Sequence, residues 1–195
     1  MLSARTRLIL NTAVLTLLAA AGVGAAVGFT VFRAGWYNIG ATSPHFKYVY
    51  RGLEQAMRYS VRHHAQDVKV PALGQAAILR GAAVYRDNCA QCHGGPGVSP
   101  EGHGLSMQPA PGPLVDASAK WKARELYWIT RHGVKMSGMP AWEFRLSDAD
   151  IWSTVAFINQ MPAMSARDYR ALTAGMALTL APPTGAPAAP GGKSQ

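Results

Sequence analysis

Cysteine is scarce in this chain, which has only two in 195 residues, Cys89 and Cys92. A fold held together by several disulfides is therefore excluded. Charge is also sparse, at 15% of the residues, and 10 acidic residues stand against 19 lysines and arginines. The sequence has no phosphate-binding glycine loop, no paired carboxylates and no nucleophile–base pair, so nothing in it indicates substrate chemistry.

The basic excess is unevenly distributed along the chain. Residues 33–70 carry six Lys/Arg against two acids, a net charge of +4, whereas residues 71–181 carry ten against eight, a net charge of +2. The more basic segment directly follows a long apolar run, where anionic lipid headgroups would attract it. The charge therefore indicates membrane lipid as a partner. No basic aromatic platform accompanies it, so no nucleic-acid partner is expected.

The apolar run covers residues 8–32 and contains no charged residue, while Arg5, Arg7 and Arg33 flank it. A bilayer span needs about 20 apolar residues, whereas the apolar core of a signal peptide has about 7 to 15. The run therefore favours a single uncleaved transmembrane anchor, and its two basic flanks do not orient it. A cleaved signal remains the alternative, because small residues such as Ala19-Ala20-Ala21 lie within the run.

Residues 33–73 are predicted to form an amphipathic helical linker. Ser43-Pro44 has the residue types of an N-cap and a first helical position. Apolar and small residues then recur every three or four positions, as on one face of a helix; they are Phe46, Val49, Tyr50, Leu53, Met57, Ser60, Val61 and His64. Such a helix lies on a membrane, docks onto a partner or packs against its own domain, and the pattern leaves all three open.

The run Cys89-Ala90-Gln91-Cys92-His93 has the spacing of a c-type haem attachment site. Two thiols separated by two residues match the two vinyl groups of one porphyrin, and the adjacent His93 can bind the iron from the proximal side. The alternatives are a thioredoxin-like redox pair or half of a zinc site. The first would need a βαβ pattern nearby and the second two further ligands, and neither is evident in the sequence.

A second axial ligand is expected in the segment Gly138-Met139-Pro140. A thioether is a soft ligand, and His/Met ligation raises the potential of a haem. Gly138 allows the backbone to approach closely and Pro140 stiffens the loop, so Met139 is the predicted ligand. Other candidates are expected to pack in the core or to end a helix instead, and these are Met107, Met136 and His132.

These motifs resemble those of the class I c-type cytochromes, in a bacterial membrane-anchored form. Gly81-x-x-x-Tyr85 leading into the cysteine motif is similar to the family's N-terminal helix, and residues 151–158 are similar to its C-terminal helix. The resemblance covers about residues 74–162. It implies that Gly81 meets Phe157 where the two helices cross, and that a proline carbonyl accepts the Nδ1–H of the proximal His93. Three prolines are candidates for that acceptor, at positions 109, 111 and 113.

The resemblance also implies the fold and the function. It predicts an all-α chain in which residues 74–172 form a small cytochrome c domain around one covalent haem c, with a disordered tail at 173–195. The haem would be attached outside the cytoplasmic membrane, which places this domain in the periplasm and residues 1–7 in the cytoplasm. The expected role is electron transfer, not enzymatic catalysis. The chain would shuttle single electrons between membrane-bound redox complexes, such as a quinol-oxidising complex or dehydrogenase and a terminal oxidase. A fixed haem subunit of a larger oxidoreductase and a haem-based ligand sensor remain alternatives.

Helix starts and ends within the domain can also be predicted. Ser118 is expected to cap a helix that runs to His132, with Gly133 just past its end. Ser147 is expected to cap the last long helix, which runs to about Met161. One more short helix is expected at residues 165–172.

Overall fold

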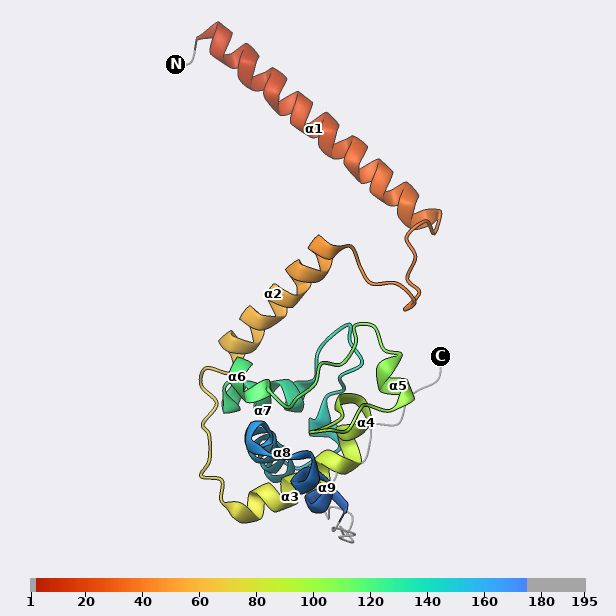
Figure 1. Cartoon of the computed structure of the whole chain (residues 1–195). Helices are drawn as coiled ribbons and strands as arrows, with labels where there is room; N and C mark the ends of the chain where they lie inside the picture. Colours follow the sequence, from red (N-terminus) through yellow and green to blue (C-terminus); the bar gives the residue numbers. More distant parts are fainter. Residues whose placement is uncertain (1–2, 175–195) are drawn as a thin grey trace, which may run out of the picture. The chain divides into compact units, whose positions relative to one another are not determined.

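The computed structural model describes residues 3–174. Within this range the regular elements are all helices, joined by loops, and no strand is formed (Figure 1). The only β-type pairing among these residues is an isolated bridge between Gly95 and Val98. The predicted all-α class is therefore confirmed for this range. The predicted tail lies outside the described residues except for Thr173 and Ala174, which are the last residues of a helix.

The elements follow one another from the N-terminus as nine α-helices and two 3-10 helices within the described residues: α1 Ala4–Arg33, α2 Lys47–His64, α3 Gln75–Asn88, α4 Ala90–His93, α5 Gly102–Leu105, α6 Ala117–Lys120, α7 Ala123–His132, η1 Trp142–Phe144, α8 Asp148–Gln160, η2 Met161–Ala163 and α9 Ala166–Ala174. They form two compact units, one up to Gly40 and the other from Ala41 onward. Each unit is described by itself.

The first unit consists mainly of α1, which contains the whole apolar run predicted from the sequence. Its 30 residues are long and apolar enough to cross a membrane, and none of them is buried in the chain. At about 1.5 Å per residue such a helix exceeds the ~30 Å of a bilayer core. By length and composition α1 is therefore a candidate membrane span.

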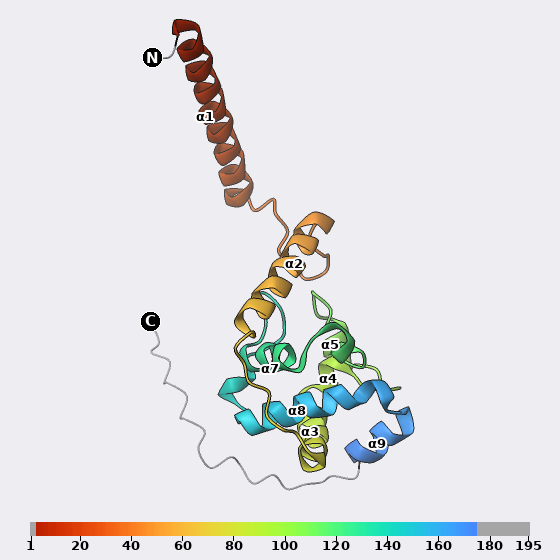
Figure 2. The same ribbon diagram turned by 90° about the vertical axis from the view of Figure 1, so that its left-hand side faces the viewer.

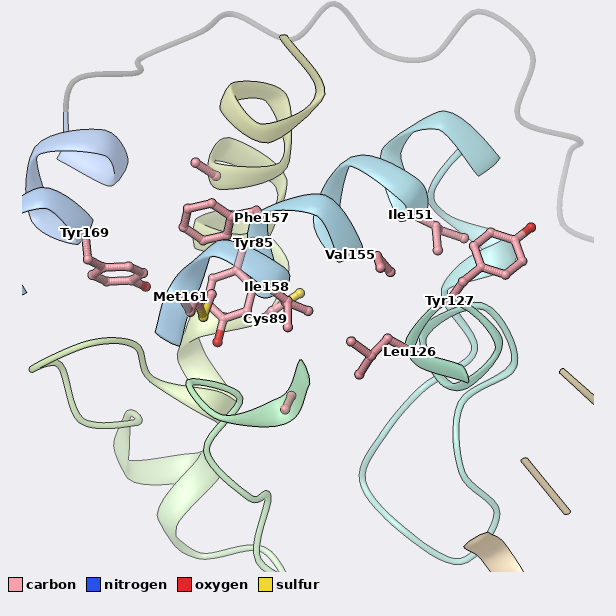
Figure 3. Packing of buried hydrophobic residues seen from close by; sticks show 12 residues of the cluster. Tyr85, Cys89, Leu126, Tyr127, Ile151, Val155, Phe157, Ile158, Met161 and Tyr169 are labelled. Carbon is pink, nitrogen blue, oxygen red and sulfur yellow. The ribbon is translucent and has the colours of Figure 1, made fainter. Parts of the chain in front are cut away.

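The second unit is built around the crossing of α3 and α8 (Figure 2). Gly81 lies at the crossing, where a Cβ would run into the backbone carbonyl of Ser153 and come within 3.0 Å of the Phe157 Cβ. The predicted meeting of Gly81 and Phe157 is therefore confirmed. Next to this contact, the ring centroids of Tyr85 and Phe157 lie 5.5 Å apart, and both residues are completely buried. The crossing thus forms the centre of the apolar cluster drawn in Figure 3.

Helix α2 is attached to α7 through its C-terminal half. Val61 and Ala65 are buried, and the His64 ring stacks on Trp128 at 5.6 Å. Just beyond the helix, the Gln66 carbonyl accepts a hydrogen bond of 3.0 Å from Arg124. The N-terminal half of α2 extends past this contact (Figures 1 and 2).

Two predicted helix starts are wrong. α2 begins at Lys47 with Phe46 at its N-cap, so Ser43-Pro44 lies outside the helix. Residues 41–46 are exposed, so little burial is available to stabilise an additional helical turn there. The helix predicted from Ser118 is interrupted at Trp121, which is extended at φ −132° and ψ 138°. The Trp121 ring packs under the Arg58 guanidinium at 5.5 Å, a tertiary contact that local sequence signals do not reveal.

Other predicted boundaries agree with the structure. α7 ends at His132, and Gly133 follows with a φ of +66°. The Ser147 hydroxyl accepts the Asp150 N–H at 3.2 Å and caps α8, which ends at Gln160.

Candidate haem-binding site

The two cysteines and the histidine of the motif share a single turn of backbone. Cys89 ends α3, and its carbonyl accepts the N–H groups of Cys92 at 3.1 Å and of His93 at 2.9 Å. Both thiols are free, and Cys89 is buried while Cys92 is half-buried. Burial, followed by the nearby Cys92, raises the pKa of Cys89 to about 12, so its thiol is protonated at neutral pH. One helical turn therefore presents two thiols and an imidazole together.

The structure determines which nitrogen of His93 is available to a metal. Its Nδ1 lies 2.7 Å from the Gly112 carbonyl oxygen. Because a carbonyl can only accept, Nδ1 must carry the proton and donate, which leaves the Nε2 lone pair free. Burial, opposed by this hydrogen bond, lowers the pKa of His93, so the neutral ligand form is favoured. The imidazole thus has the protonation state and the fixed orientation of an axial ligand.

The predicted acceptor for His93 was a proline, and this prediction is wrong. Gly112 lies between Pro111 and Pro113, and its carbonyl accepts the hydrogen bond. Every residue has a backbone carbonyl, so the acceptor depends on the path of the loop and not on the type of side chain. The flanking prolines restrict that path because each fixes its own φ.

Met139 lies in a short loop between α7 and η1 that is closed by its own hydrogen bonds. The Met139 N–H donates to the Ser137 hydroxyl at 3.1 Å, and the Met139 carbonyl accepts the Val134 N–H at 3.2 Å. Gly133 is required where the loop leaves α7, because a Cβ there would lie 2.7 Å from the Met139 carbonyl oxygen. Met139 is half-buried, whereas Met136 is 80% exposed, so the core packing predicted for Met136 is wrong. The loop therefore holds the Met139 backbone in one conformation.

One segment, residues 101–112, contacts both the cysteine motif and the methionine loop. Gly104 of α5 packs closely on Cys92, since a Cβ added at Gly104 would lie 2.8 Å from the Cys92 Cα. Met107 lies against the loop, since a Cβ on Gly138 would lie 2.7 Å from the Met107 sulfur. The segment then ends at Gly112, the partner of His93. The roles of Gly104, Met107 and Gly112 were not predicted, and the only hint in the sequence was the richness of this loop in glycine and proline.

Other side chains near the site have packing roles. Leu126 of α7 is buried in the same apolar cluster as Cys89 (Figure 3). His132, predicted to end a helix, is the exposed last residue of α7; its Nδ1 lies 3.2 Å from Glu143, and its ring lies 4.9 Å from Trp128. Trp121 and Trp128 pack against side chains of α2.

The donor set fits a c-type haem better than the two alternatives considered. No group of three or more His, Cys, Asp and Glu side chains among residues 3–174 is placed to hold a metal ion, which counts against zinc. The same residues form no strand, so a thioredoxin-like pair would lack its βαβ framework. Two adjacent thiols, an oriented neutral imidazole and a thioether are the groups that haem attachment and His/Met ligation require.

The helical fold around one such motif defines a c-type cytochrome domain, an electron-transfer haem protein. Residues 76–158 match the family model described as "Cytochrome C oxidase, cbb3-type, subunit III", which confirms the class predicted from the sequence. The match includes α3 from its second residue to most of α8, and therefore both the cysteine motif and the methionine loop. Helices α1 and α2 lie outside it. No solved structure was found to match the chain.

Proposed function

We propose that this protein is a membrane-tethered periplasmic cytochrome c with one haem, which carries single electrons between respiratory complexes. Cys89 and Cys92 would hold the haem through thioether bonds, and His93 and Met139 would be the axial ligands. The observation that carries this proposal is the hydrogen bond from His93 Nδ1 to the Gly112 carbonyl, which leaves Nε2 as the only free nitrogen of the ring.

The bound haem would supply a one-electron couple at its iron. Within the protein, His93 and Met139 would both hold the iron and so leave no open site for oxygen or peroxide. A neutral thioether opposite an imidazole raises the potential of the couple. The hydrogen bonds that hold both ligands would let electrons be gained and lost without rearrangement of the chain. An electron carrier needs these properties, and an oxygen-activating enzyme would need an open site.

The tether would be α1, with residues 1–7 in the cytoplasm and the cytochrome domain in the periplasm. A tether raises the effective concentration of the carrier at membrane-bound partners without any additional contact. The partners proposed are a quinol-oxidising complex or dehydrogenase as the donor and a terminal oxidase as the acceptor. The bare apolar surface of α1 supports the anchor over a helix buried in the protein core.

A second function, that of a fixed haem subunit in a larger oxidoreductase, is favoured by the family match, whose printed description names an oxidase subunit. Purification from native membranes in mild detergent separates the two. A shuttle is expected to elute alone or in substoichiometric amounts, because transient redox complexes have small interfaces. Co-elution with other subunits at constant stoichiometry would instead establish the fixed subunit and contradict the shuttle.

A further inference from the structure

Helix α2 divides into a packed half and a bare half along one continuous apolar face. At its C-terminal end this face packs on the cytochrome domain, where Val61 is 1% exposed. The same face continues toward the N-terminus as four large apolar side chains without cover, with exposed fractions between 46% and 75%; they are Phe46, Val49, Tyr50 and Leu53. Two turns of amphipathic helix therefore extend beyond the domain with an apolar surface in solvent.

The charge of α2 indicates what kind of surface would cover this face. Four basic residues lie along one flank of the apolar stripe at helical spacing, and the only acid in the helix, Glu54, is paired with one of them, Arg58, at 2.8 Å. The basic residues are Lys47, Arg51, Arg58 and Arg62. Residues 71–174, by contrast, carry ten Lys/Arg against eight acids. Two of the four, Lys47 and Arg51, lie beside the bare apolar stripe, so this half of α2 complements a surface that is apolar inside and anionic outside.

The covalent chain limits how far α2 can lie from a bilayer. Residues 34–46 connect α1 to α2. At about 3.3–3.6 Å per residue these thirteen residues span at most ~45 Å when fully extended. If α1 is the membrane anchor, as the proposed function holds, the bare face remains within reach of the lipid surface at all times. A diffusing protein partner has no such constant proximity.

We infer that the N-terminal half of α2, residues 46–53, binds in the plane of an anionic membrane surface. Its apolar side chains enter the boundary between headgroups and acyl chains, and the exposed Lys47, Arg51 and Arg62 reach the phosphates. Because the C-terminal half of α2 is fixed to α7, the orientation of the helix on the membrane sets the orientation of the cytochrome domain. The lipid contact thus restricts the rotation of a tethered carrier and limits which face it presents to its partners.

Photocrosslinking of the full chain in native membranes tests this inference. The photoreactive amino acid p-benzoylphenylalanine replaces Leu53 on the bare face or, as the matched control, Gln55, which is exposed on the opposite side of the helix. The mass of the irradiated chain is then measured. The expected result is a phospholipid adduct at position 53, with a yield at least several-fold higher than at position 55. Equal yields at the two positions, or an adduct at 53 with a protein in place of lipid, would overturn the inference.

Charge reversal gives a second readout. The double variant Arg51→Glu with Arg62→Glu is expected to lower the lipid adduct at position 53 several-fold, whereas Arg167→Glu on α9 is expected to leave it unchanged. An unchanged adduct in the double variant would overturn the role assigned to anionic lipid. The haem absorbance and the recovery of each variant in the membrane fraction are recorded in parallel. Loss of either one would contradict the proposed function, whereas a missing lipid adduct with both intact contradicts only the inference.

Discussion

At the scale of single residues, the site depends on backbone groups as much as on side chains. Cys89, Cys92, His93 and Met139 can be proposed as site residues from the sequence, because thiols, imidazoles and thioethers have distinctive chemistry at recognisable spacings. The carbonyl of Gly112 was not predictable, since its role follows from the path of a loop. The contact between the Met107 sulfur and Gly138 was missed for the same reason, because it joins two loops that are distant in the sequence.

The assignment of Met139 as the distal ligand predicts a difference between two methionines of the same loop. Met139→Ala is expected to open the iron to carbon monoxide and to lower the potential by a sizeable fraction of the ~0.8 V range that axial ligands span. Met136→Ala is expected to change neither, because its side chain is 80% exposed. Redox titration and carbon monoxide binding to the reduced protein measure both effects, and exchanged roles of the two variants would refute the assignment.

At the scale of elements, helix existence was easier to predict than helix boundaries. The cap at Ser147 was correct because its signal is local, a hydroxyl that accepts the N–H three residues ahead. The cap at Ser118 was wrong because α6 already begins at Ala117, with Asp116 at its N-cap. The helix also ends early, at Lys120, and the Trp121 ring packs against Arg58 of α2. The crossing at Gly81 was predictable only through the family resemblance. Side-chain periodicity alone indicates which face is buried, but not what lies against it.

The crossing of α3 and α8 predicts opposite effects for two helical glycines. Gly81→Ala is expected to lower the free energy of unfolding by about 1–3 kcal/mol, because the new Cβ meets the Ser153 carbonyl and outweighs the gain in helix propensity. Gly52→Ala in α2 is the control, since nothing lies within 4 Å of a Cβ there. It is expected to be neutral or stabilising by up to ~1 kcal/mol. Denaturant titrations monitored by circular dichroism compare the two, and equal effects would refute the close crossing.

The ion pair between Arg80 of α3 and Asp150 of α8 predicts a pH-dependent contribution to stability. The Arg80 Nε lies 2.6 Å from the carboxylate. Burial raises the pKa of Asp150, but hydrogen bonds from Arg80 and Ser147 outweigh it and leave the pKa below its ordinary value. A carboxyl group whose pKa is lower in the folded state stabilises the fold above its unfolded pKa, and this contribution is lost as the pH falls through the folded pKa.

Arg80→Ala is therefore expected to lower the free energy of unfolding near neutral pH. The loss should not exceed about 1 kcal/mol, because the arginine side chain is 49% exposed. The difference from the unmodified protein should shrink as Asp150 becomes protonated in acid. Urea titrations across the acidic range measure it, with the exposed Arg167→Ala on α9 as the control. If Arg80→Ala lowered the free energy of unfolding by the same amount at every pH, the contribution assigned to the ion pair would be contradicted.

At the scale of the whole molecule, the chain joins a cytochrome c domain to two helices that the family match does not include. α1 provides an apolar surface of membrane length, and α2 is attached to the domain through only half of its length. The apolar run and the amphipathic pattern predicted both helices, but the sequence did not show that α2 is packed at one end and bare at the other. That division depends on where α7 lies, since it meets α2 near the C-terminal end, where His64 stacks on Trp128.

The mass of the purified full chain under denaturing conditions tests the central claim most directly. The predicted result is a chain heavier than the bare polypeptide by the mass of one haem. This increase should be lost in a Cys89→Ser, Cys92→Ser double variant and retained in Gln91→Ala. A colourless chain with the mass of the bare polypeptide, or one that binds zinc through these cysteines, would contradict the account.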